Sequence, residues 1–167
     1  MKNPTKRRVM LVRHAKAVEE DVAGDHARSL SARGKNDAAE LGAWIEEQGL
    51  WPELVLCSTA TRTRETLAGL GKTLPTQLND KIYLASAGEL LAQIQQCDDA
   101  VASVMVIAHN PGLHGLLALL VGDYANDADA DKVMLKFPTA ACAVLEFDVA
   151  NWKDIAPQGG TLRVLRY

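Results

Sequence analysis

Short, continuous apolar runs alternate along this chain with longer stretches whose apolar positions have helical spacing. The runs at residues 9–12, 54–57 and 104–108 predict buried strands, because strands covered on both faces of a sheet are apolar throughout. Weaker signals predict further strands at residues 82–84, 141–147 and 162–165. Helical periodicity predicts helices at residues 34–48, 62–74, 88–96 and 113–121. This alternation predicts a three-layer α/β/α sandwich with a mostly parallel central sheet.

Several single residues sharpen these boundaries. Gly49 is expected to end the first helix and Pro75 the second. The unbroken apolar run at 104–108 predicts a central strand. Residues 122–131 are acidic and are expected to form a solvated loop. Their Asp-x-Asp-x-Asp spacing is that of a calcium loop, but Lys132 stands where the turn glycine is required.

Length and charge restrict the class of protein. A chain of 167 residues suits one domain, and residues 1–7, with several basic side chains, are expected to be a flexible tail. The net charge of -3 predicts no general attraction to nucleic acid or to an anionic membrane. Since no long apolar segment follows the basic residues, we expect neither a signal peptide nor a membrane span, and a cytoplasmic location. Three widely spaced cysteines predict free thiols rather than disulfides.

Polar residues follow the predicted strands at the points where chemistry is usually sited in an α/β protein. Arg13 and His14 follow the first strand, Ser58 and Arg62 the second, and His109 the run at 104–108. If these strand ends share one edge, they form a pocket of two arginines and two histidines. A guanidinium group can bind phosphate oxygens through two parallel N–H···O hydrogen bonds, and a histidine side chain can form a covalent intermediate. The pattern therefore predicts a phosphate site that contains a nucleophile.

Three other phosphate or metal chemistries fit the sequence less well. A cysteine phosphatase requires an arginine six positions after its cysteine, and Thr63 stands there relative to Cys57. His109 and His114 are five residues apart, rather than the four that place two metal ligands on one helical face. The chain has no glycine-rich nucleotide loop and no carboxylate pair placed to hold magnesium. We therefore expect no metal and no cofactor.

Five stretches of the chain together resemble the histidine phosphatase superfamily, which is also called phosphoglycerate mutase-like, and within it the SixA-type phosphohistidine phosphatases. They are residues 11–17 (LVRHAKA), 28–34 (RSLSARG), 57–63 (CSTATRT), 108–113 (AHNPGL) and 137–141 (FPTAA). They occur in the order of the family and extend over most of the chain.

The resemblance implies a role for each matching residue. His14 matches the nucleophile that becomes phosphorylated, Arg13 and Arg62 match the two phosphate-binding arginines, and His109 matches the second histidine of the site. Asn110 matches a frequent neighbour of that histidine and is a further phosphate-binding candidate. Arg64 is expected to lie on the helix surface.

The sequence departs from the family pattern at two positions. Ala15 stands where the wider superfamily has glycine, and Thr59 where it has proline. Thr59 is a candidate N-cap for the helix that carries Arg62.

The proton donor is the missing part of the predicted site. Many members of the superfamily place a carboxylic acid after the third strand, and here Glu89 and Asp25 are the candidates. An ester needs its leaving oxygen protonated, whereas the imidazole of a phosphohistidine carries its own proton. The predicted activity is therefore a phosphohistidine phosphatase acting on a phosphohistidine-containing protein. The alternatives are a phosphomonoesterase for a small phosphorylated metabolite and a phosphoprotein-binding module without turnover.

Overall fold

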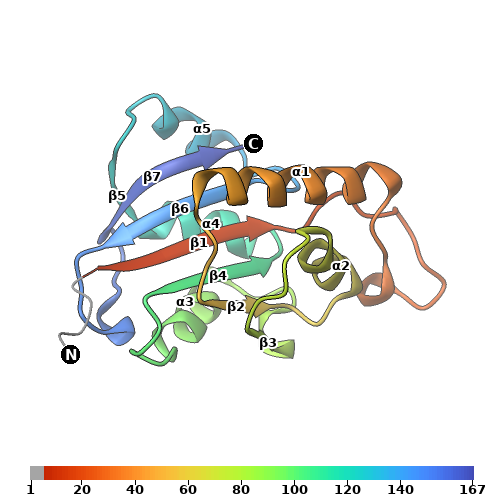
Figure 1. The fold of residues 1–167 in the computed structure, drawn as a ribbon, viewed down its shortest axis with the longest axis horizontal. Helices are drawn as coiled ribbons and strands as arrows, with labels where there is room; N and C mark the ends of the chain where they lie inside the picture. Colours follow the sequence, from red (N-terminus) through yellow and green to blue (C-terminus); the bar gives the residue numbers. More distant parts are fainter. Residues whose placement is uncertain (1–5) are drawn as a thin grey trace.

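The computed structural model describes residues 6–167 and contains one seven-stranded sheet (Figure 1). The order of the strands across the sheet is β3-β2-β4-β1-β6-β7-β5. Their bounds are β1 Arg7–Arg13, β2 Leu54–Cys57, β3 Thr76–Leu78, β4 Ser103–Ala108, β5 Val121–Tyr124, β6 Cys142–Phe147 and β7 Gly160–Arg166.

The sheet is mostly parallel, as predicted. Within residues 6–167, β6 alone runs antiparallel to its neighbours β1 and β7, and every other pair is parallel. The run at 104–108 forms the interior strand β4, which has a parallel neighbour on each side.

Helices cover both faces of the sheet and complete the three layers (Figure 1). Alternate residues of β1 serve the two faces, because successive side chains of a strand point in opposite directions. Val9 and Leu11 belong to the apolar cluster that contains residues of α3 (Ala87–Gln95) and α4 (Gly112–Leu120), and Met10 and Val12 to the cluster that contains residues of α1 (Ala32–Gln48). The helices are α1 Ala32–Gln48, α2 Thr61–Gly69, α3 Ala87–Gln95, α4 Gly112–Leu120 and α5 Asp129–Leu135.

A serine cap begins α1, and the predicted Gly49 ends it. Ser31 caps the helix by accepting a hydrogen bond from the backbone N–H of Gly34. Gly49 ends it in the left-handed conformation, with φ of 64°. Gly34 also lets the helix approach the chain that follows β1, since a Cβ there would lie 2.0 Å from the carbonyl oxygen of Lys16.

The region between α2 and α3 differs from the prediction. The predicted strand at 82–84 is wrong, because Asp80–Ile82 form a 3₁₀ turn that the Asn79 side chain caps. The strand of this region is β3, whose three residues are all exposed at the sheet edge and therefore carry no apolar signal. The helix predicted to reach residue 74 ends at Gly69, and Gly71 follows with φ of 81°.

Two segments that were predicted to be irregular contain residues of helices or strands. The acidic stretch 122–131 contributes to the strand β5 and to the helix α5, rather than forming a solvated loop. The flexible tail predicted for residues 1–7 is wrong at its last residue; residues 1–5 lie outside the described part. Arg7 begins β1, is fully buried, donates hydrogen bonds to the carbonyls of Val101 and Ala150, and lies over the Trp152 ring.

Among residues 6–167, none of the helices combines the length and hydrophobicity that a membrane crossing requires.

Candidate active site

Three parallel strands end at one edge of the sheet and bring the predicted polar residues together. Arg13 is the register partner of Ala108, which immediately precedes His109. The backbone N–H of His14 donates to the carbonyl of Ala108 at 3.2 Å, and that of Ser58 to Ile107 at 3.1 Å. As a result, the His14 and His109 rings lie with their centroids 5.3 Å apart.

His14 is held in the form that a nucleophile needs. Its Nδ1 lies 2.7 Å from the carbonyl oxygen of Ala15. A carbonyl can only accept, so Nδ1 carries the proton and the lone pair is on Nε2. Burial, followed by the charges of Arg62 and Arg13, lowers the pKa of His14 to about 4, despite the opposing hydrogen bond to Ala15. At neutral pH the imidazole is therefore uncharged and able to attack phosphorus.

The backbone around His14 is fixed from two sides. The N–H of Ala140 donates to the carbonyls of Arg13 and His14, and the N–H of Ala15 donates to Thr66 Oγ1. Ala15 is fully buried in a small cluster with Leu30 and Ala140. This environment accommodates the alanine that replaces the glycine of the wider superfamily.

Ser58 orients the second histidine of the site. Its Oγ lies 2.8 Å from His109 Nε2 and also accepts from the backbone N–H of Ala60. A hydroxyl has one hydrogen and two lone pairs, so Ser58 can donate to Nε2 while it accepts from Ala60. His109 then carries its proton on Nδ1. Burial and the nearby Arg62 lower the pKa of His109 to about 3, so it acts as a neutral donor.

Three buried nitrogens of the site lack a hydrogen-bond partner. Within the described residues, they are the complete set of buried side-chain N or O atoms left unpaired: Arg13 Nε, Arg62 Nε and His109 Nδ1. Leaving such a group unpaired costs about 1–3 kcal/mol, more for a charged group. Two guanidinium N–H groups and one imidazole nitrogen beside the neutral His14 are suited to bind the oxygens of a phosphoryl group.

Asp25 lies beside these donors but is not suited to donate a proton. Its Oδ2 accepts from Tyr83 Oη and from Arg62 Nη2, the latter at 3.1 Å, and its Oδ1 accepts from Arg28 Nε at 3.0 Å. The Tyr83 hydrogen bond, with the charge of Arg62, lowers the pKa of Asp25 to about 2, so the carboxylate is ionised at neutral pH. The structure therefore does not support Asp25 as a general acid.

Glu89 is equally unsuited to be the proton donor. It is the third residue of α3, where its carboxylate accepts from the backbone N–H of Ser86 while Ser86 Oγ accepts from the N–H of Glu89. This reciprocal pair is a capping box. Hydrogen bonds to Ser86 lower the pKa of Glu89, so the carboxylate is ionised as well.

Asn110, a predicted phosphate-binding residue, makes two structural hydrogen bonds. Its Nδ2 donates to the carbonyl of Phe137 at 2.8 Å, and its Oδ1 accepts from the backbone N–H of His114 in α4. The same carbonyl of Phe137 accepts from Arg13 Nη1 at 3.2 Å. Asn110 thus fixes the loop that orients Arg13, and both ends of its amide are engaged.

Sequence reasoning assigned no role to Ser58, Thr66 or Tyr83. The Tyr83 ring stands edge-on to His109, with the centroids 5.5 Å apart, and its hydroxyl reaches Asp25. Thr59 does not cap α2; it donates to Asp80 and lies 2.9 Å from His26 Nε2. These contacts join segments that are distant in sequence, so a local sequence pattern cannot predict them.

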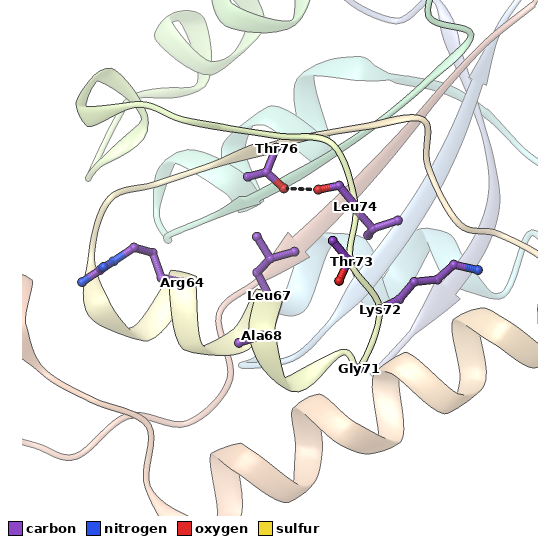
Figure 2. Close-up of a pocket in the computed structure, with 8 residues that line it drawn as sticks. All are labelled: Arg64, Leu67, Ala68, Gly71, Lys72, Thr73, Leu74 and Thr76. Carbon is purple, nitrogen blue, oxygen red and sulfur yellow. Dashed lines mark hydrogen bonds between the residues drawn. The ribbon is translucent and has the colours of Figure 1, made fainter.

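Other groups near the site are excluded from its chemistry. Cys57 is fully buried, and burial raises the pKa of its thiol to about 12, so it remains protonated. Arg64 is exposed, as predicted. It lines a hollow along the outer side of α2 together with Leu67, Lys72 and Thr76 (Figure 2).

Within residues 6–167, no group of three or more metal-ligating side chains comes together.

The fold and the site together define a class of α/β protein in which the ends of parallel strands bring two arginines beside two neutral histidines. Residues 9–85 match the family model of the histidine phosphatase superfamily, branch 1. The chain belongs to the histidine phosphatase superfamily.

Solved structures and a curated relative extend this comparison over most of the chain. A proposed phosphohistidine phosphatase SixA from Nakamurella multipartitia has a TM-score of 0.86 and 28% identity, with 99% of this chain and 98% of that chain covered. Another, from Agrobacterium tumefaciens, has a TM-score of 0.75 and 30% identity over 84% and 92% of the two chains. An uncharacterised protein of Mycobacterium tuberculosis is 35% identical over 87% of this chain and 92% of its own.

Proposed function

We propose that this protein is a metal-independent phosphatase that hydrolyses protein phosphohistidine through a phosphorylated His14. The observation that carries the proposal is the combination of a free Nε2 on His14 with three unpaired nitrogens on the neighbouring residues Arg13, Arg62 and His109. An anion site without turnover has no need of a neutral histidine whose free nitrogen can attack phosphorus.

The reaction proceeds in two steps. In the first, the lone pair of His14 Nε2 attacks phosphorus in line, the bond to the leaving group breaks, and its electron pair stays with the leaving group. Arg13, Arg62 and His109 bind the equatorial oxygens, where charge is spread in the transition state. In the second step, water attacks the phospho-His14 intermediate and releases inorganic phosphate and the free imidazole.

The absence of a suitable acid among the predicted candidates favours an N–P substrate. Asp25 and Glu89 are both ionised, and a positioned acid contributes about two to four orders of magnitude to reactions that require one. The imidazole of phosphohistidine leaves as a neutral molecule when its distal nitrogen is protonated. The SixA-type names of the solved relatives agree with this substrate class.

A substrate panel tests the proposal. The purified protein is assayed with a phosphohistidine peptide, a phosphoserine peptide and a sugar phosphate, with His14→Ala as the inactive control. We expect the highest kcat/KM on phosphohistidine and no turnover by the variant. Faster hydrolysis of the sugar phosphate would instead identify a small-metabolite phosphomonoesterase, and binding without hydrolysis would identify a phosphoprotein-binding module.

A further inference from the structure

The Asp25 carboxylate lies next to the phosphate-binding groups and remains negatively charged. Donors from three separate segments hold it: Arg28 in its own loop, Arg62 in α2 and Tyr83 after the 3₁₀ turn. The backbone carbonyl of Asp25 also accepts from Arg62 Nη1 at 2.8 Å. An anion fixed at this place requires an explanation, because it repels the phosphoryl group that the neighbouring donors attract.

The carboxylate retains room for one more partner. An ionised carboxylate offers about four acceptor positions, and side-chain donors occupy three of them here. The Asp25 side chain is 47% exposed, while that of Arg62 is 3% exposed. Asp25 also lines an open hollow together with Glu19, Glu20 and Asp21. The remaining acceptor position is therefore accessible to a part of the substrate that lies outside the buried phosphate-binding residues.

The chemistry of the leaving group decides whether this anion helps or hinders. An alkoxide that leaves from a phosphate ester gains negative charge, which a nearby carboxylate disfavours. A phosphohistidine protonated on its distal nitrogen carries a positive charge on the imidazole, which the same carboxylate favours. A hydrogen bond from that N–H to an ionised acceptor is also stronger than a neutral one.

We propose that Asp25 is a specificity-determining residue that accepts a hydrogen bond from the distal N–H of the phosphohistidine imidazole. This inference rests on the proposed function. In the step it assists, the Nε2–P bond to His14 forms while the N–P bond of the substrate breaks. The electron pair of the broken bond stays on the substrate nitrogen. The distal proton remains in place, and the imidazole departs neutral, so no acid is needed.

The first test compares two substrates in one variant. For the wild type and Asp25→Asn, kcat/KM is measured on a phosphohistidine peptide and on p-nitrophenyl phosphate, whose leaving group has no N–H. We expect the ratio of the two values to fall about 10- to 100-fold in the variant, the range for a hydrogen bond to a charged group. Rates on p-nitrophenyl phosphate report any disturbance of Arg62. Glu89→Gln, which changes an ionised carboxylate outside the site, is the matched control and keeps the wild-type ratio.

The second test uses the wild-type protein and is independent of any variant. Phosphoimidazole and phosphorylated 1-methylimidazole differ in the distal N–H, and each enzymatic rate is divided by the rate in buffer. We expect the enzyme to accelerate phosphoimidazole at least about tenfold more.

Two results overturn the inference alone: equal acceleration of the two imidazoles, or an unchanged substrate ratio in Asp25→Asn while the wild type prefers phosphohistidine. A wild type that hydrolyses p-nitrophenyl phosphate but not the phosphohistidine peptide overturns the proposed function itself.

Discussion

Replacing Ser58 by alanine tests whether this hydroxyl controls the second histidine of the site. Ser58 is fully buried and His109 is only 2% exposed. Water therefore cannot easily reach this position to replace a hydrogen bond that the serine hydroxyl has lost. The change removes the 2.8 Å contact with His109 Nε2 and the acceptor of the Ala60 N–H. Both the stability of the fold and the orientation of the histidine proton depend on these contacts.

The expected magnitudes follow from the two contacts. A buried group left unpaired costs about 1–3 kcal/mol, so the free energy of unfolding of Ser58→Ala should fall by at least that amount. Without the hydroxyl, the proton of His109 is no longer restricted to Nδ1. Complete loss of one transition-state donor costs about 100- to 1,000-fold in kcat, so a partial loss should cost roughly 10- to 100-fold.

Urea unfolding and hydrolysis rates are measured on the same preparations, with Ser103→Ala as the matched control. Ser103 is also buried and its Oγ accepts from the backbone N–H of Glu53, but it lies at the opposite end of β4 from the site. The control should lose stability and keep its activity. Wild-type kcat in Ser58→Ala, with a stability loss equal to that of the control, would refute the role assigned to the hydroxyl.

Three further predictions concern stability and the site. Asn110→Ala should lower Tm and weaken competitive inhibition by inorganic phosphate only slightly, through the loop that orients Arg13; a loss of inhibition as large as that of Arg62→Ala would instead support the direct phosphate contact first expected of Asn110. Gly112→Ala should lower the free energy of unfolding by about 1–3 kcal/mol or more in urea titrations, because its Cβ would lie 1.8 Å from a backbone carbonyl; Gly88→Ala, with open space around it, should cost nothing. The free energy of unfolding should fall as the pH falls from about 6.5 towards 4, because the fold lowers the pKa values of His14 and His109 and the unfolded chain therefore binds more protons in this range. If the free energy of unfolding of His14→Gln depends on pH as steeply as that of the wild type, this explanation is wrong.

The accuracy of the sequence-based predictions follows the burial of each element. β1, β2 and β4 lie inside the sheet and are apolar on both faces, which made their positions readable. Because these strands are parallel, their carboxyl ends lie at the same edge of the sheet, and this places Arg13, His14 and His109 together. No further information was needed to predict that placement. β3 escaped prediction because its three residues are exposed, and neither hydrophobic periodicity nor length marks such a strand.

The polar partners of the site depend on tertiary contacts that a linear pattern does not contain. Tyr83 and Asp25 are 58 positions apart, and Arg62 and Asp25 are 37 apart. As an aspartate, Asp25 could have been a general acid. The hydrogen-bond donors that surround its carboxylate keep it ionised instead. The contacts of Asn110 with Phe137 and with the start of α4 are likewise tertiary, and its predicted phosphate contact stays a prediction.

The central claim is that His14 carries the phosphoryl group during turnover, and trapping the phosphoenzyme tests it most directly. The protein is mixed with a ³²P-labelled phosphohistidine peptide, quenched in alkali within milliseconds to seconds, and digested for mass spectrometry. We expect an acid-labile, alkali-stable label on the peptide that contains His14, and neither label nor turnover in His14→Ala. Turnover that persists in this variant, or a label carried by another residue, would contradict the account.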